Sequence, residues 1–260
     1  MKTNYNHEDI LTFAVRVGEI MLKSGAETYR VEDTIVRLLS SHHFTKVDTF
    51  VTPTGITTTI GSDTIPLCTT VCRVKNRSTR LDKIEYINQL SRDYVCGSLD
   101  LGDAIRRLDE IDQTPAYLDK TIVLTTGIAA ASFSLMFGAH LLEFVIALFT
   151  GITVALLQIR LRKKEIISYF ILFLSAMFIG AVVVVSSFIF ADKVNIESIV
   201  IGGVMPLVPG VAFTNAVRDT IGDELLSGMS RGVEALFIAV AIAAGVGVSM
   251  SIGLFLGGIF

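Results

Sequence analysis

The chain has 260 residues, of which 51% are hydrophobic and 18% charged, and its mean hydropathy of +0.61 is too high for an ordinary soluble enzyme of this length. A net charge of −3, without a block rich in Lys and Arg, argues against nucleic-acid binding. The three cysteines have no His or Cys partners at metal spacing and fit a reducing compartment, so we expect neither a metal ion nor a cofactor.

The charges are unevenly distributed along the chain. Residues 1–120 hold 15 of the 22 Lys and Arg residues and 17 of the 25 Asp and Glu residues. A polar segment of this size can bury a core of its own, whereas the remainder needs lipid as its solvent. We therefore predict an α+β domain over residues 1–118 and a transmembrane domain over residues 119–260.

The first domain begins with two helical patterns. Ile10, Ala14, Val17 and Met21 recur at helical spacing, and Gly25 is expected to end this helix. A second helix is expected to follow at once, because Ser24-Gly25-Ala26-Glu27 has the form of a capping box.

The periodicity then changes to that of strands. Residues 47–60 and 64–74 are rich in Thr, Val and Ile, and turn residues interrupt them at 53–55 and 61–63. This pattern predicts a small antiparallel sheet. Helical patterns return in two further segments, near 79–94 and 103–111.

The second domain consists of long uncharged stretches separated by charged residues. A helix needs about 20 apolar residues to cross the hydrocarbon core of a bilayer. We predict a polytopic α-helical membrane protein with five transmembrane helices, near 121–140, 142–160, 167–190, 197–216 and 233–257.

The basic residues predict the orientation of these helices. Arg160, Arg162, Lys163 and Lys164 follow the second span, whereas the loops on the other side contain only His140 and Lys193. The positive-inside rule then places the N-terminal domain in the cytoplasm and the C-terminus outside. The N-terminus has no apolar segment of the secretory type, which agrees with a cytoplasmic domain.

One acidic residue lies at the outer end of the second predicted span. Glu143 is close to His140 in the sequence. Two interpretations are open, an interfacial residue or a proton relay, and the interfacial one is favoured.

The fourth span contains an unusual segment, Gly202-Gly203-Val204-Met205-Pro206-Leu207-Val208-Pro209-Gly210. Each proline removes a backbone donor, so Pro206 and Pro209 should break the helix. Transporters use such breaks as binding sites, and the free N–H groups of a half-helix after Gly210 could hold a carboxylate. The alternative is a simple kink that allows neighbouring helices to pack closely.

A polar cluster follows the break. It consists of Asn215, Arg218, Asp219, Asp223, Glu224, Arg231 and Glu234. Asn215, Arg218 and Asp219 are spaced to share one helix face. We expect Arg218 to attract or hold a substrate carboxylate, Asn215 to add hydrogen bonds, and Asp219 or Asp223 to carry coupling protons. The alternative is a solvated loop whose acids and bases pair with one another.

The N-terminal domain offers few residues for catalysis. Glu27, Arg30, Asp33 and Arg37 form a ladder of charges that is most simply a salt-bridge face, and Thr54 lies in a predicted turn. No P-loop, dinucleotide fingerprint or Gly-x-Ser-x-Gly motif is present, so we do not expect an enzyme.

Three segments together resemble the threonine/serine exporter family. They are residues 24–34, which include Glu27, Arg30 and Glu32; residues 50–56, which include Thr52, Pro53, Thr54 and Gly55; and Pro206-x-x-Pro209-Gly210 leading into Asn215-x-x-Arg218-Asp219. The resemblance runs from about residue 10 to the end of the chain. Long members of the family join a cytoplasmic domain and about five spans to a second, smaller membrane domain.

The resemblance implies an expectation about partners. This chain covers only the first part of a long member, and so it is similar to the larger subunit of the split, two-component form, as in bacterial succinate (dicarboxylate) exporters. The partner is then expected to be a small membrane subunit of four or five spans. The small-residue pattern Gly253-x-x-x-Gly257 also favours an oligomer.

From these features we expect a polytopic subunit of an exporter in the bacterial cytoplasmic membrane. Its substrate would be a small carboxylate, either a C4-dicarboxylate such as succinate or threonine/serine. The alternative hypothesis is a membrane-tethered sensor or hydrolase-like regulatory protein. An anchor alone needs one span and no broken helix, which favours transport.

Overall fold

The structure is a computed structural model that describes residues 6–42, 44–75, 77–190 and 193–257. The chain forms two compact units, one made of residues 1–115 and 211–233 and the other of residues 116–210 and 234–260. The first unit thus takes a segment from the predicted transmembrane half. The assignment of residues 1–118 to the cytoplasm and 119–260 to the membrane stays a prediction.

The first unit has the predicted order of two helices, three strands and two helices. Its elements are α1 (His7–Lys23), α2 (Thr28–Ser40), β1 (Lys46–Thr52), β2 (Gly55–Gly61), β3 (Cys68–Arg73), α3 (Leu81–Val95) and α4 (Leu101–Asp112). The strands form an antiparallel sheet in the order β1-β2-β3, in which Thr52 pairs with Gly55 across the first hairpin. The α+β prediction for this part of the chain is confirmed.

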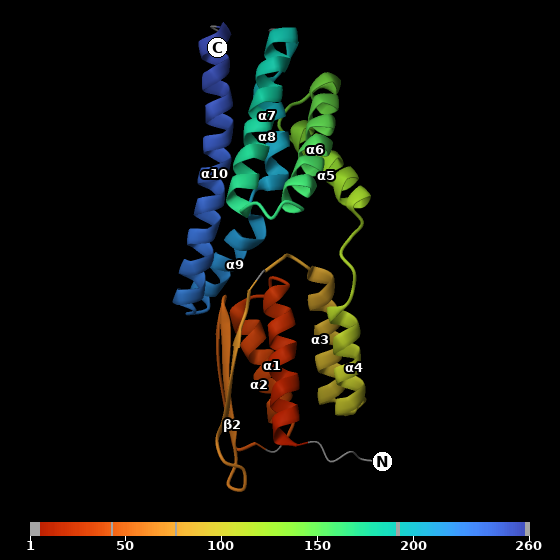
Figure 1. Ribbon diagram of the computed structural model, residues 1–260, viewed down its shortest axis with the longest axis vertical. Coiled ribbons are helices and arrows are strands. Elements are labelled where there is room, and N and C mark those ends of the chain that lie inside the picture. The colour runs from red at the N-terminus through yellow and green to blue at the C-terminus, as the bar shows by residue number, and fades with distance from the viewer. Residues whose placement is uncertain (1–5, 43, 76, 191–192, 258–260) are drawn as a thin grey trace. The chain divides into compact units, whose positions relative to one another are not determined.

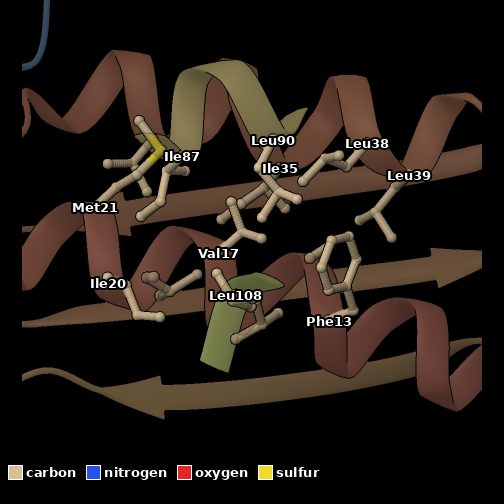
Figure 2. Close-up of a cluster of buried hydrophobic side chains, with 14 of the residues drawn as sticks. Phe13, Val17, Ile20, Met21, Ile35, Leu38, Leu39, Ile87, Leu90 and Leu108 are labelled. Atoms are coloured by element: carbon tan, nitrogen blue, oxygen red, sulfur yellow. The ribbon is translucent and has the colours of Figure 1, made fainter. Parts of the chain in front are cut away.

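The core of the first unit lies around α1, which packs between the sheet and the pair α3–α4 (Figure 1). Phe13, Val17 and Met21 are almost fully buried, and they come from one face of α1. Figure 2 shows Met21 beside Ile87 of α3, Val17 beside Ile35 of α2, and Phe13 towards Leu38 and Leu39 of α2. Helical spacing of apolar residues therefore identified the faces that form this core.

The turn between α1 and α2 differs from the predicted capping box. Gly25 has a φ of +91°, a conformation that favours glycine, and it terminates α1 as expected. The N–H of Ala26 donates to the Met21 carbonyl at 3.1 Å, which closes this helix end. Ser24 is therefore the C-cap of α1, and the N-cap of α2 is Glu27, without a side-chain cap. The capping-box prediction was wrong because the residues needed to end α1 occupy the same positions.

The remaining elements are helical. They are α5 (Asp119–Met136), α6 (Leu141–Arg162), α7 (Ser168–Phe190), α8 (Ile196–Val204), the 3-10 turn η2 (Met205–Leu207), α9 (Gly210–Ile221) and α10 (Leu225–Gly257). In the second unit, small residues allow close helix contacts. A Cβ on Gly151 of α6 would lie 2.8 Å from the Thr126 carbonyl oxygen of α5, and one on Gly245 of α10 would lie 2.4 Å from the Phe173 carbonyl oxygen of α7.

Three described helices, α6, α7 and α10, are long and apolar enough to cross a bilayer. A fourth span is added if α8 with its 3-10 turn and α9 count as one interrupted span. Helix α5 coincides with the first predicted span, but it is 18 residues long and opens with Asp119 and Lys120. The described residues therefore contain three to four candidate membrane spans, and the exact number of five is not confirmed.

The predicted break in the fourth span is confirmed. Helix α8 ends at Val204, a single 3-10 turn contains Pro206, and Val208 is extended before α9 begins at Gly210. The predicted fifth span begins earlier than expected, since α10 starts at Leu225. Gly253 of the expected oligomerisation pattern packs against Val184 of α7, and the surroundings of Gly257 lie outside the described residues.

Candidate functional site

The α1–α2 turn and the segment 211–233 meet within the first unit and form a polar cluster. Asn215, Arg218 and Asp219 come from α9, and Arg231 comes from the beginning of α10. All four side chains contact the α1–α2 turn or each other. This agrees with the expectation that the three α9 residues share one helix face.

The backbone of the α1–α2 turn provides two acceptors. Asn215 donates from Nδ2 to the Gly25 carbonyl at 2.9 Å, and Arg231 donates from a terminal guanidinium nitrogen to the Ala26 carbonyl at 2.7 Å. Carbonyls at a helix end have no partner within the helix and must find one elsewhere. Both donors are buried, with 5% of Asn215 and 4% of Arg231 exposed, so these contacts fix α9 and α10 on the turn.

The carboxylate of Glu27, in the α1–α2 turn, contacts two arginine side chains of the cluster. One oxygen of its carboxylate accepts from Arg218, and the other lies 3.2 Å from a guanidinium nitrogen of Arg30. Burial raises the pKa of the Glu27 carboxyl, but its own backbone N–H, Arg30 and Arg218 outweigh burial and hold the pKa below the ordinary value of 4.5. The carboxylate is therefore ionised at neutral pH. Its contribution to stability is present above pH 4.5 and is lost as the pH falls through the lowered pKa.

Asp219 and Arg231 form a second and more buried ion pair. The Arg231 Nε lies 3.1 Å from the Asp219 Oδ2, and their side chains are 5% and 0% exposed. A charge in such an environment is tolerated only when it is paired. Asp219 is therefore held by Arg231, on the same side of α9 as Asn215.

The structure brings together only some of the predicted site residues. Residues in the cluster are Glu27, Arg30, Asn215, Arg218, Asp219 and Arg231. Asp223 is exposed in the turn between α9 and α10, with a φ of +64°. Pro206, Pro209, Gly210 and Glu234 belong to the second unit.

The predicted turn at residues 52–55 is a tight β-hairpin connection. The Thr52 hydroxyl donates to the Gly55 carbonyl at 3.3 Å, and the Val74 N–H donates to the Thr54 carbonyl at 2.9 Å. Pro53 is buried, whereas Thr54 is exposed. These hydrogen bonds stabilise the β1–β2 connection, so the motif has a structural role there.

The pKa of Glu32, on the second turn of α2, is shifted in the opposite direction to that of Glu27. Burial and the negative charge of Glu224 raise the pKa of its carboxyl above 4.5, although the backbone N–H of Val51 acts in the opposite direction. Since the folded state holds this proton more tightly, its stability falls as the pH rises through the raised pKa.

The Glu32→Gln variant is therefore expected to melt higher than the wild type at pH 7, by on the order of 1 °C. The difference should vanish below about pH 4.5, where the carboxyl is protonated in both states. Thermal unfolding of the detergent-solubilised chain from pH 4 to pH 8 measures it. Glu85→Gln on the exposed side of α3 is the control and should leave the melting temperature unchanged. A Glu32→Gln variant that melts lower at pH 7 would contradict the expectation.

Two residues of the cluster were missed as site residues. Gly25 and Ala26 take part through their carbonyl oxygens, and a backbone acceptor leaves no signature in the side-chain sequence. The available signal was the resemblance segment 24–34, which contains both residues.

The chain matches the family model of threonine/serine exporters over residues 12–253. It is 24% identical over 245 residues to a probable threonine/serine exporter of Mycobacterium tuberculosis, an alignment that covers 93% of this chain and 46% of that protein. It is 23% identical over 250 residues to a threonine/serine exporter of Corynebacterium glutamicum, with 94% of this chain and 51% of that protein covered.

The chain thus spans about half the length of the curated relatives that it matches. No solved structure matches it significantly. Because the family model covers nearly the whole chain, this protein belongs to the threonine/serine exporter family.

Proposed function

We propose that the chain is a subunit of an exporter of small carboxylates in the bacterial cytoplasmic membrane. The substrate is threonine/serine or a C4-dicarboxylate such as succinate. Family membership supports export and implies a non-enzymatic protein rather than a tethered hydrolase or sensor. The observation that carries the proposal is the interrupted α8–α9 segment, which leads within one short helix to the half-exposed guanidinium of Arg218.

The exporter includes a second polypeptide. This second polypeptide is a small membrane subunit of four or five spans, as the resemblance to the split, two-component form implies. We expect the complete transporter to be an oligomer.

The membrane topology has five spans. Helix α5 is added to α6, α7, the interrupted α8–α9 segment and α10, with the N-terminal domain in the cytoplasm and the C-terminus outside. The basic residues Arg106, Arg107 and Lys120 before the first span and the basic cluster at 160–164 support this orientation.

The substrate carboxylate is recognised near the beginning and middle of α9. A Cβ on Gly210 would meet no atom of the described residues within 4 Å, so the first turn of α9 is open on that side. Arg218 is 52% exposed, so its guanidinium group can bind an anion. Asn215 and Arg231 act by holding α9 in place, and Asp223 is better suited than the paired Asp219 to exchange protons with water.

The test is efflux from loaded vesicles that contain the chain and its partner. Arg218→Gln is expected to raise the KM for the carboxylate about tenfold or more, because a charge-assisted hydrogen bond contributes about 1.5–3 kcal/mol. Arg37→Gln is the matched control, since Arg37 is also about half exposed, at 51%, and pairs with Asp33. If Arg218→Gln transports like the Arg37→Gln control, Arg218 does not bind substrate.

A further inference from the structure

We propose that Glu27 is an internal carboxylate ligand of Arg218, and that a substrate carboxylate displaces it during transport. The proposal rests on the proposed function, since it names the group that occupies Arg218 when substrate is absent. It also gives a role to Arg30, whose ion pair with Glu27 remains after the substrate has bound to Arg218.

The geometry provides the first argument. The Glu27 carboxylate bridges two guanidinium groups, because one oxygen meets Arg218 and the other meets Arg30. A carboxylate between two arginines is the arrangement in which a free carboxylate substrate would bind. The side chain of Glu27 is 8% exposed, so it is the fixed partner, whereas Arg218 at 52% reaches solvent.

The cost of the exchange provides the second argument. Breaking a buried ion pair is expensive when it leaves a charge unpaired. Glu27 is not left unpaired, since it keeps Arg30 and the hydrogen bond from its own backbone N–H. Arg218 is half exposed, so water screens its pairing with Glu27 more than it screens a pair of buried charges. A substrate that binds with a millimolar Kd can therefore compete.

The neighbouring contacts limit what the exchange can loosen. Arg231 and Asp219 are nearly fully buried, and Asn215 and Arg231 hold the carbonyls of the α1–α2 turn. These contacts remain when Arg218 leaves. The exchange therefore frees one contact of α9 while the rest of the cluster stays in place, and it links substrate occupancy to the α1–α2 turn.

The first test is a comparison of transport constants in vesicles that contain both subunits. Glu27→Gln removes the competing charge and is expected to lower the KM for succinate or threonine by about threefold to tenfold. Glu27→Asp keeps the charge on a shorter side chain, which weakens the bridge, and should give an intermediate KM if Glu27→Gln does not fold. Asp33→Asn removes a carboxylate from the exposed Arg37 pair on the same helix and should leave KM unchanged. A purely structural role of Glu27 would lower the maximal rate without lowering KM, and this result would overturn the proposal.

The second test does not depend on transport. Hydrogen exchange of the full-length chain in detergent is followed with succinate, with threonine and with chloride alone. Succinate or threonine should accelerate exchange in residues 25–30 of the wild type, but not in Glu27→Gln, whose contact is already broken. If hydrogen exchange accelerates in the wild type but no efflux is found, the displacement of Glu27 is supported and the export function is rejected. If efflux is found without faster hydrogen exchange, and Glu27→Gln has the same KM as Asp33→Asn, the displacement is rejected and the export function is supported.

Discussion

The Arg231→Met variant is expected to destabilise the first unit by about 3–5 kcal/mol, because it leaves the Asp219 carboxylate buried without the cation that pairs with it. Asp219 is 0% exposed and Arg231 only 5%. The variant also removes the donor to the Ala26 carbonyl, which adds an unsatisfied acceptor. No other substitution in the polar cluster removes a cation from so enclosed a position.

Thermal or denaturant unfolding of the detergent-solubilised chain measures this loss. The double variant Arg231→Met/Asp219→Leu should recover a large part of the stability, since it removes both charges. Arg37→Met is the control at an exposed pair and should cost about 0–1 kcal/mol. A double variant as unstable as Arg231→Met would show that the cost does not come from the unpaired Asp219 charge.

The Glu143→Ala variant is expected to destabilise the second unit by about 3 kcal/mol. Glu143 is 1% exposed, and its two oxygens accept from the backbone N–H groups of His140 and Asn195, each at 2.9 Å. His140 is the N-cap of α6 and Asn195 is the N-cap of α8, so one carboxylate joins the beginnings of two helices. The side chain is therefore buried between two helix beginnings, and its expected position at the membrane interface stays a prediction.

The same unfolding assay, with Glu143→Gln as the conservative variant, tests the role of Glu143. The Gln oxygen can satisfy one N–H, so its cost should be about half that of Glu143→Ala. Efflux separates the structural role from a proton relay. If Glu143→Gln folds with nearly normal stability and has lost all transport, Glu143 acts in proton transfer, contrary to the expectation.

Local patterns were sufficient for most of the fold. Residues that are close in the chain determine three of the predicted features, and all three are present. They are the buried face of α1 with Val17 and Met21, the Thr-rich strands, and the helix break at Pro206 and Pro209. The start of α2 was misplaced because ending α1 and capping α2 competed for residues 24–27. Helix α10 begins eight residues before the predicted span, because the helix continues beyond the apolar stretch from which the span was predicted.

The members of the polar cluster could be named from the sequence more readily than the contacts between them. Helical spacing put Asn215, Arg218 and Asp219 on one helix face, and the family resemblance named Glu27 only as part of a separate motif in the N-terminal domain. That Glu27 and Arg218 meet across 191 residues of sequence could not be inferred, because no local pattern encodes a contact at this separation. The pairing also gives Arg218 a partner within the chain, in addition to the substrate carboxylate expected from the sequence.

The discontinuous first unit has a consequence for biosynthesis. Residues 1–115 leave the ribosome before their complement, residues 211–233, has been translated. Until then, the Gly25 and Ala26 carbonyls and the Glu27 carboxylate lack Asn215, Arg231 and Arg218. Helices α5 to α8 are made in this interval. The first unit can therefore be completed only after these helices have been synthesised. Its complete folding thus requires that the candidate membrane segments before residue 211 have already been translated.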